Sequence, residues 1–344
     1  MASFPVTVYR WDDSGAPQIT DGLASEYLNV LHKCLVEGYG SKLPLGWTRP
    51  FHNATSHISV YRNNTNAGGS GSCVRFSREG ANSPFGIIRT TYAVDMTAIN
   101  TYVKRGFTQG FSTLSGVSSG YEPIKWIMVG TVTAFYFFAA DVFAQKVQQQ
   151  NANGVGFFAG DIFSTIPNDI GRFIAGGSAS GDNTLGNNWF DHIHYTLYSA
   201  AIPTPSANVF RIYSADNHNS SAFYGLYPGL PCLGNGPSSG ESYLANAPLS
   251  TQLSAPVLLV RPNELPGNST TKDRLGIPIT NSTITPYLRG VMPGMKIALY
   301  TGYRDQNWGH VAVIDGVDHL IVPQTTTGGS NVVIELGSWH DPFN

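Results

Sequence analysis

Hydrophobic and polar residues alternate along most of the chain, a pattern that predicts β-strands. Turns rich in Gly, Asn and Ser separate the alternating segments. We expect strands at Phe4–Tyr9, Ser56–Asn63, Ser72–Arg78, Gly86–Val94, Ile124–Gly130, Thr133–Ala139, Gly156–Phe163, Gly171–Gly176, Leu288–Tyr300, Gly309–Val322 and Asn331–Gly337. The predicted fold class is α+β, predominantly β, with antiparallel sheets, one clear N-terminal helix and a long proline-rich loop region.

One segment has the spacing of an amphipathic helix instead. Its apolar residues recur every three or four positions, at Ala24, Tyr27, Leu28, Leu31, Cys34 and Leu35. We expect Asp21 or Ser25 to cap the start of this helix, and Gly38 or Gly40 to end it. Cys34 lies on the apolar stripe, so we expect a buried hydrophobic residue and not a reactive thiol.

Four further segments need separate interpretation. Met96–Lys104 is expected to form a short helix, Asn63–Gly71 a flexible hairpin tip and Gln145–Gly154 an exposed turn. Trp126–Ala144 is long and apolar enough for a membrane-spanning helix. However, its β-branched and aromatic residues favour two buried strands, and Asp141 would be costly in lipid.

A change of composition divides the chain near residue 200. Nine of the 21 prolines fall between residues 201 and 266, and proline cannot donate a hydrogen bond to a sheet. We therefore expect an α+β domain at 1–200, and a proline-rich loop region followed by a closing β domain at 201–344. Because such loops have no core of their own, 201–266 is also the candidate segment for contacts between subunits.

The composition points to a chain that buries surface against partners. Only 12% of the 344 residues are charged, against about 25% in a typical protein. Interfaces are depleted in charge and enriched in aromatic residues. The net charge of −2 and the lack of a Lys/Arg cluster disfavour nucleic-acid binding. The three cysteines, Cys34, Cys73 and Cys232, indicate neither a disulfide framework nor a zinc motif, and no signal peptide is expected.

Two groups near the N-terminus have structural interpretations. Asp12 and Asp13 are expected to form a turn after the first strand, because no D-x-D-x-D-G calcium loop is present with them or with Asp216. Trp47 and Phe51 are expected to pack on the stripe of the helix, since aromatic side chains of this size dominate local burial.

Several segments resemble known sequences both in their residues and in their order along the chain. They are VYRWDDSGAP at 8–17, CLVEGYGSKLPLGWTRPF at 34–51, SVYRN at 59–63, VGFFAGDIFSTIPND at 155–169, LRGVMPGMKIALY at 288–300 and NVVIELGSWHDP at 331–342. Together these segments resemble a family of mostly uncharacterised virion structural proteins of tailed bacteriophages. The resemblance covers about residues 1–200 and 286–344, and the proline-rich middle has no counterpart in it.

The resemblance implies a place in the phage particle and supplies no catalytic, cofactor-binding or metal-binding residue. We predict a structural assembly component of the virion, in the tail, baseplate or neck, with the head surface as a second location. It would be made in the host bacterial cytoplasm, form a homo-oligomer and contact other virion proteins. No enzyme activity, cofactor, nucleic acid or membrane span is expected. The alternative is a module that binds a host-surface glycan through exposed Trp308, Trp339 and Tyr303.

Hydrolytic chemistry has weak signals in the sequence. G-x-S-x-G occurs around Ser118 and Ser238, but neither match has the strand before it and helix after it that a nucleophile elbow needs. Glycan cleavage needs two carboxylates at a fixed separation. Asp161 lies between two strand-like segments, but the sequence does not pair it with a second carboxylate.

The metal question rests on Asp191, His192 and His194. In a strand, the two histidines would point to one face, but a zinc site needs three or four ligands. No spacing recommends another histidine to complete the set; those available are His218, His310, His319 and His340. We therefore interpret the pair as structural residues of a strand.

Overall fold

The fold is antiparallel β with one N-terminal helix, which confirms the predicted fold class. The computed structural model describes residues 2–78, 82–84, 86–114, 116, 122–140, 145–147, 154–179, 209–214, 223–228, 254–261, 287–298, 303, 306–322 and 331–343. Most of the proline-rich segment 201–266 lies outside these residues, so its contacts between subunits stay a prediction.

The predicted helix is present and buries the predicted stripe. α1 spans Ala24–His32 and continues as one π-helical turn, η1, at Lys33–Glu37. All six apolar residues of the stripe, Cys34 included, are buried in one core cluster. Gly38 ends the helix with φ of +80°, a conformation that favours glycine, so the predicted stop is confirmed.

The start of α1 differs from the prediction. Neither Asp21 nor Ser25 caps it, because Leu23 occupies the N-cap position and no side chain caps there. Glu26 takes over this role from inside the first turn. Its carboxylate accepts the backbone N–H groups of Leu23 at 2.8 Å and Asp21 at 3.1 Å, and it is a favourable negative charge at the helix N-terminus.

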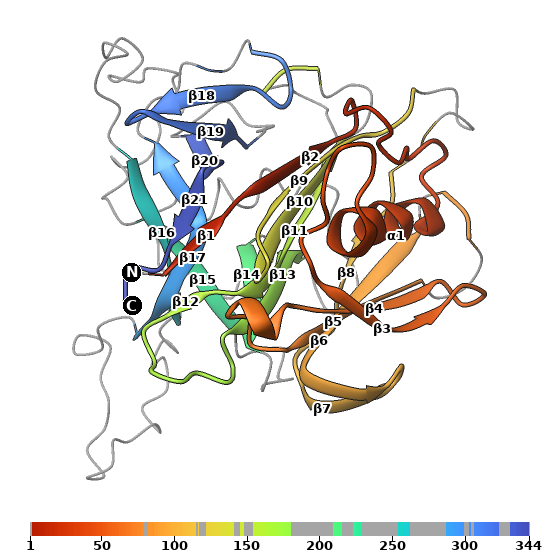
Figure 1. Ribbon diagram of the computed structural model, residues 1–344, viewed down its shortest axis with the longest axis horizontal. Coiled ribbons are helices and arrows are strands. Elements are labelled where there is room, and N and C mark those ends of the chain that lie inside the picture. Colours follow the sequence, from red (N-terminus) through yellow and green to blue (C-terminus); the bar gives the residue numbers. More distant parts are fainter. Residues whose placement is uncertain are drawn as a thin grey trace.

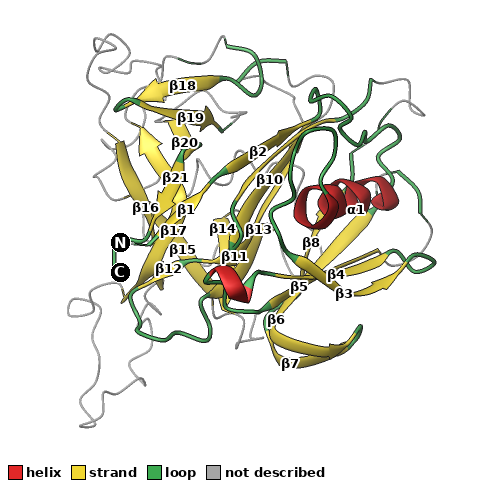
Figure 2. Ribbon diagram, viewed as in Figure 1, coloured by secondary structure: helices red, strands yellow, loops and turns green. Residues whose placement is uncertain are grey.

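A six-stranded sheet lies beside α1 (Figure 2). Its order is β3-β4-β5-β6-β7, with β8 also paired to β6. Its strands are β3 Thr48–Asn53, β4 Ile58–Arg62, β5 Cys73–Arg78, β6 Ile87–Ala98, β7 Thr101–Arg105 and β8 Gln109–Ser112. The short helix predicted at Met96–Lys104 is wrong. This segment contains the end of β6, the turn at 99–100 and most of β7. Met96 is buried with Val60 and Cys73 on one face of the sheet.

A larger sheet of thirteen strands forms the rest of the fold. Its order is β18-β19-β20-β17-β16-β15-β14-β13-β11-β10-β9-β2, with β12 paired to β17. The strands are β2 Thr7–Arg10, β9 Lys125–Gly130, β10 Ala134–Ala140, β11 Gly154–Asp161, β12 Phe163–Ser164, β13 Phe173–Ala179, β14 Val209–Ser214, β15 Phe223–Pro228, β16 Ser254–Arg261, β17 Tyr287–Ala298, β18 Val311–Ile314, β19 Val317–Ile321 and β20 Asn331–Glu335.

The middle strands of the large sheet are buried on both faces. In Figure 1, α1 and the six-stranded sheet lie on one side of β9–β11, and β16–β20 lie on the other. Side chains of β10 alternate between two core clusters, with Phe135 and Phe137 in one and Tyr136 and Phe138 in the other. This double burial explains the apolar residues from Trp126 to Ala140 and confirms the two strands predicted at Ile124–Gly130 and Thr133–Ala139. Among the described residues, no helix is long and apolar enough to cross a membrane.

The two ends of the chain meet in a third, two-stranded sheet. β1 (Ser3–Pro5) pairs with β21 (Ser338–His340), and the termini lie side by side in Figure 1. The domain boundary predicted near residue 200 stays a prediction. The strands that flank it, β13 and β14, are hydrogen-bonded neighbours in the large sheet.

Candidate functional site

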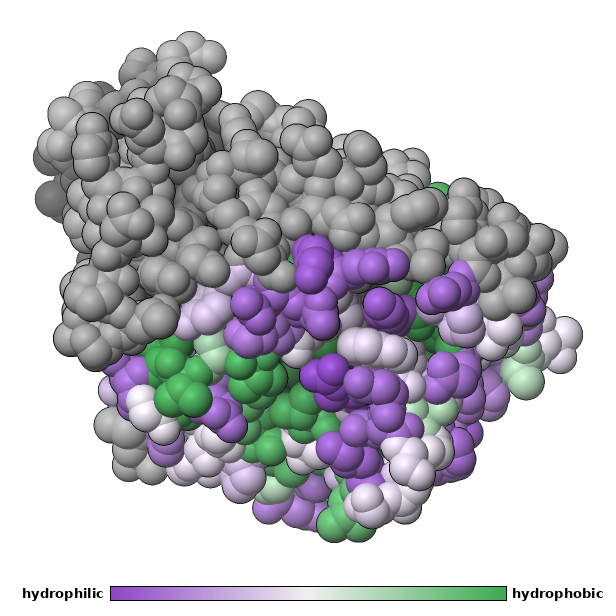
Figure 3. Space-filling view, turned by 90° about the horizontal axis from the view of Figure 1, so that it is seen from above, coloured by the Kyte–Doolittle hydropathy of each residue, from purple (hydrophilic) through white to green (hydrophobic). Residues whose placement is uncertain are grey.

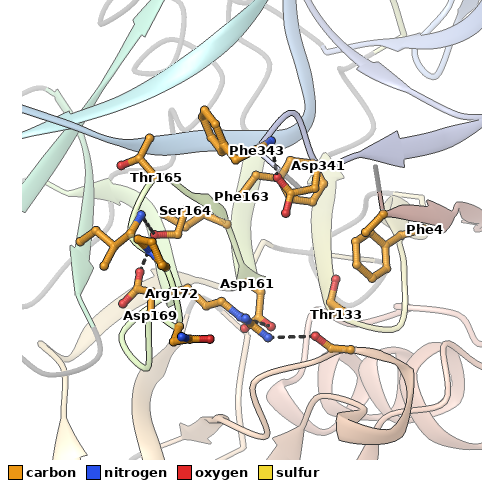
Figure 4. A pocket seen from close by; sticks show the side chains of 16 residues that line it. Phe4, Thr133, Asp161, Phe163, Ser164, Thr165, Asp169, Arg172, Asp341 and Phe343 are labelled. Carbon is orange, nitrogen blue, oxygen red and sulfur yellow. Dashed lines mark hydrogen bonds and ion pairs between the residues drawn. The ribbon is translucent and has the colours of Figure 1, made fainter.

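A pocket of about 320 Å³ opens where β1, the end of β11, the loop after β12 and the C-terminal segment meet (Figure 4). Its polar lining comes from strand ends and turns, where side chains are free to face a cavity. The described lining residues are Ala2, Phe4, Gly68, Thr133, Asp161, Ile162, Phe163, Ser164, Thr165, Ile166, Pro167, Asn168, Asp169, Arg172, Asp341 and Phe343.

Three carboxylates line this pocket, those of Asp161, Asp169 and Asp341. Asp161 is the last residue of β11. Figure 4 shows Arg172 directed toward it. Asp161 accepts hydrogen bonds from the backbone N–H of Ser70 at 2.8 Å, the Ser70 hydroxyl at 2.6 Å and Nε of Arg172 at 3.2 Å. Burial raises the pKa of Asp161 above its usual range, while Arg172 and Ser70 act in the opposite direction.

These contacts fix the loop between β4 and β5. Asn63 Nδ2 donates to the carbonyl of Thr133, and Asn63 Oδ1 accepts the N–H of Gly71. Arg172 donates to the carbonyl of Gly68. The hairpin predicted at Asn63–Gly71 is confirmed, because β4 and β5 pair antiparallel on either side of it, but its tip is held by these hydrogen bonds and is not free. Its Gly and Asn residues form a turn that packs on the large sheet.

The carboxylate of Asp169 forms an ion pair with Arg289 of β17. Only 8% of the Asp169 side chain and 4% of the Arg289 side chain are exposed. The Ser164 hydroxyl donates to Asp169 at 2.6 Å, and the Gly171 N–H donates at 2.9 Å. Burial would raise the pKa of Asp169, but the hydrogen bonds from Arg289 and Ser164 outweigh burial and hold this pKa below its usual range.

The ion pair holds a loop that presents apolar side chains. Thr165 adds a hydrogen bond from its hydroxyl to the carbonyl of Leu288 at 2.8 Å. In the same loop Ile166 is 38% exposed and Ile170 is 58% exposed, and Phe343 across the pocket is 43% exposed. We call these three residues the apolar rim. The loop that carries Ile166 and Ile170 is thus held in place by the Asp169–Arg289 ion pair and the Thr165 hydrogen bond while it exposes hydrophobic side chains.

The pKa of Asp161 is raised and the pKa of Asp169 is lowered, and opposite shifts of this kind are also the pattern of an acid/base pair. However, Asp161 receives three hydrogen bonds from Ser70 and Arg172. Asp169 receives bonds from Ser164 and Gly171 as well as its arginine. Groups committed in this way hold loops together and are poorly placed to exchange a proton with a substrate.

Sequence reasoning singled out Asp161 but missed Asp169, Arg172 and Arg289. A signal existed, because Arg289 stands in the otherwise apolar strand segment YLRGVM, and a charge in such a strand is rarely buried without a partner. The identity of the partner was not accessible, because Asp169 is far from Arg289 in the sequence.

The aromatic residues predicted to contact a glycan are placed differently. Trp308 is 4% exposed and Trp339 is 1% exposed, so their expected exposure is wrong. Trp308 packs on Trp11 with ring centroids 5.0 Å apart, and the indole N–H of Trp339 donates to the carbonyl of Glu335. Both rings complete the core, and Tyr303 is half-buried.

The Asp pair near the N-terminus is a turn, as predicted. Asp12 pairs with Arg10 at 2.8 Å, and Asp13 accepts the backbone N–H of Arg10 and the hydroxyl of Tyr39. These contacts tie the turn after β2 to the segment that follows the helix.

Trp47 and Phe51 are separated by the structure. Trp47 is buried in the cluster that contains the helix stripe, and its indole N–H donates to the carbonyl of Thr131. Phe51 packs against a different cluster on the other face of the six-stranded sheet, so its predicted contact with the helix is wrong.

No group of three or more His, Cys, Asp or Glu residues is arranged to hold a metal ion within the described part of the chain. His319 is buried in β19, where its Nδ1 donates to the carbonyl of Val317. Ser118 and Ser238 and the cluster of Asp191, His192 and His194 lie outside the described residues.

Comparisons with protein families and with curated proteins give no match to this chain. The resemblance to virion structural proteins of tailed phages therefore stays a prediction.

Proposed function

We propose that this chain is a structural assembly component of a tailed-phage virion, in the tail, baseplate or neck, with the head surface as the second location. It would act as a homo-oligomer that also contacts other virion proteins, and not as an enzyme. The observation that carries the proposal is the apolar rim, in which exposed hydrophobic residues stand on a loop held by a buried ion pair.

The apolar rim has the physical properties of a docking surface. Single exposed hydrophobic residues are common, but Ile166 and Phe343 line one pocket from two distant segments, and Ile170 lies in the same loop as Ile166. The Asp169–Arg289 pair fixes the loop before any partner arrives. A loop that is already ordered loses little conformational entropy on binding, so more of the burial energy appears as affinity.

A second surface of the same kind is the β18 end of the large sheet. β18 has the sequence VAVI, without a charged residue, and Val311 and Val313 are 39% and 64% exposed. Among the described strands it has one neighbour, β19. Soluble monomers usually protect an edge strand with charge or proline. Figure 3 shows hydrophobic side chains gathered between hydrophilic ones on one face of the molecule.

The sequence supports the same proposal independently. A chain with 12% charged residues has few groups with which to keep its surface separate from its neighbours. The alternative of a glycan-binding module loses two of its three proposed contact residues, because the rings of Trp308 and Trp339 are buried.

The experiment replaces Ile166 and Ile170 together with Asp, and compares this variant with Val103→Asp on β7. Val103 is also a large exposed hydrophobic residue, at 43% exposure, and does not line the pocket. We expect sedimentation to show an oligomer for the wild type and for Val103→Asp. The rim variant should be smaller at the same concentration while keeping its melting temperature.

Two results would contradict the proposal. One is a wild-type protein that stays monomeric at high concentration and is missing from phage particles. The other is a rim variant that assembles into particles as well as the wild type.

A further inference from the structure

A second pocket, of about 370 Å³, lies between α1 and the β3–β4 hairpin. It is separate from the apolar rim and shares no lining residue with the pocket there. Its described lining residues are Ser25, Leu28, Asn29, His32, Arg49, His52, Ala54, His57 and Ser59. We call it the basic pocket.

The composition of the basic pocket is unusual for this chain. The protein has nine histidines, and three of them line this one cavity together with an arginine. None of the described lining residues is acidic. A concave surface with groups of one sign concentrates ions of the opposite sign.

Arg49 is the permanent charge of the basic pocket. Its guanidinium lies near the hydroxyl of Tyr61, and no carboxylate lies within ion-pair distance of it among the described residues. A guanidinium carries five N–H donors in a planar fork that matches a carboxylate or a phosphate. One contact to Tyr61 therefore leaves donors for a ligand.

His52 and His57 add imidazole rings from the β3–β4 hairpin. Nδ1 of His52 donates to the carbonyl of Ile58 at 3.0 Å, so Nε2 of the neutral ring is left as an acceptor for a hydroxyl of the ligand. His57 has φ of +48°, in the left-handed region that non-glycine residues seldom occupy. Its backbone is fixed there, because its carbonyl accepts the N–H of Arg78 and its N–H donates to the carbonyl of Ala54.

The carboxylate nearest to this set is already engaged. Glu37 accepts a hydrogen bond from Nε2 of His32 at 2.8 Å and another from Lys33 at 2.6 Å. Burial lowers the pKa of His32, and the charge of Arg49 lowers it further. The positive charge of Arg49 therefore acts on another group that lines the pocket.

We propose that the basic pocket binds a sugar-sized molecule that carries one anionic oxygen group, either a carboxylate or a phosphate ester. Arg49 is the main contact to the anionic group, and the ring N–H of His57 is a further donor, while Nε2 of His52 accepts a hydrogen bond from a hydroxyl of the ligand. Ser25, Asn29 and Ser59 face the same cavity and hydrogen-bond with hydroxyl groups of the ligand. A volume of about 370 Å³ is at the small end of the range for ligand pockets and is larger than a bare anion requires.

The test is calorimetric titration of the full chain with four probes: glucuronate, glucose 6-phosphate, inorganic phosphate and glucose. We expect binding of glucuronate, glucose 6-phosphate or both, and no binding of glucose. A preference between the two anionic sugars identifies the anionic group. Binding of inorganic phosphate alone would mean an adventitious ion only and would overturn the proposal, as would equal binding of glucose.

Variants locate the binding. Arg49→Gln should weaken the binding by roughly tenfold or more, the loss expected for a charged hydrogen bond, while Arg49→Lys should keep part of it. Arg105→Gln on the exposed strand β7 removes the same charge elsewhere and should change nothing. Unchanged affinity in a folded Arg49→Gln variant would overturn the proposal, as would failure of the wild type to bind either anionic sugar.

Discussion

Asp169 and Arg289 form an ion pair with 8% and 4% of their side-chain surfaces exposed, and it joins the loop after β12 to strand β17. Two charges taken out of water are stable only while they stay together. The pair is therefore a lock on the loop that carries Ile166 and Ile170.

Breaking the Asp169–Arg289 ion pair should lower the free energy of unfolding far more than neutralising Asp161. We expect Asp169→Asn to lower the free energy of unfolding by about 3–5 kcal/mol, because it leaves the buried charge of Arg289 without its partner. Asp161→Asn should cost about 1 kcal/mol, because its partner Arg172 is 32% exposed and can be solvated. Urea denaturation at pH 7 measures both values, and equal losses would contradict the assignment.

Acid should weaken the lock with a definite sign. The pKa of Asp169 is lowered in the folded state, so its contribution to stability is complete above the unfolded pKa of about 3.9. That contribution is lost as the pH falls through the folded pKa. The stability difference between wild type and Asp169→Asn should therefore shrink below about pH 4. Urea midpoints at a series of pH values measure this difference, and a constant difference down to pH 2 would be the contrary result.

Asp161 should behave in the opposite way. Its folded pKa is raised, so its contribution to stability is present below the unfolded pKa and is lost as the pH rises through the folded pKa. Asp161→Asn removes this loss. The variant should therefore be closest to the wild type in free energy of unfolding near neutral pH, and should fall furthest below it in acid. The same urea series measures whether the stability loss shrinks in acid for Asp169→Asn and grows in acid for Asp161→Asn.

His57 should separate stability from binding. Its left-handed backbone costs a non-glycine residue about 1–2 kcal/mol, so His57→Gly should keep or raise the free energy of unfolding. The same change removes one donor of the basic pocket and should weaken the binding of anionic sugars. Lys104→Gly, at φ of +50° on the β7 strand, is the matched control. It should affect stability in the same direction and leave the affinity unchanged.

Gly160 should be irreplaceable for a steric reason. A Cβ atom at this position would lie 2.2 Å from Cα of Ala134 and 2.5 Å from the carbonyl oxygen of Thr133, on the neighbouring chain segment. Gly160→Ala should therefore lower the free energy of unfolding by about 3 kcal/mol or more. At Gly316 a Cβ would meet nothing within 4 Å, so Gly316→Ala should lose only the backbone term of about 1–2 kcal/mol. Thermal melting of the two variants tests this ranking.

The sequence predicted the elements that carry their own local pattern. The stripe from Ala24 to Leu35 repeats at helical spacing, and it forms α1 with the expected buried face. Ile124–Gly130 and Thr133–Ala139 were recognisable as strands because aromatic and β-branched residues dominate them. The helix predicted at Met96–Lys104 was wrong because Met96 packs against Cys73 of the neighbouring strand β5. This is a tertiary contact that the local pattern does not contain.

The sites depend on contacts that no local pattern contains. Asp169 lies in the loop after β12 and Arg289 lies in strand β17, so the two meet only after the chain has folded. The basic pocket draws His32 from α1, Arg49 and His52 from β3, and His57 from the turn after β3. The glycan prediction chose Trp308 because tryptophan is a common sugar contact, but the sequence could not show that the ring fills the core against Trp11.

The central claim, that this chain is part of a tailed-phage particle, is tested most directly by quantitative mass spectrometry of tailed-phage particles purified from cells that produce the chain. Particles should be banded by density and washed in high salt before digestion. The proposal predicts peptides of this chain in a fixed ratio to the major structural proteins, with a copy number that matches a closed ring or spike. Absence of the chain from particles that retain their other tail and head proteins would contradict it.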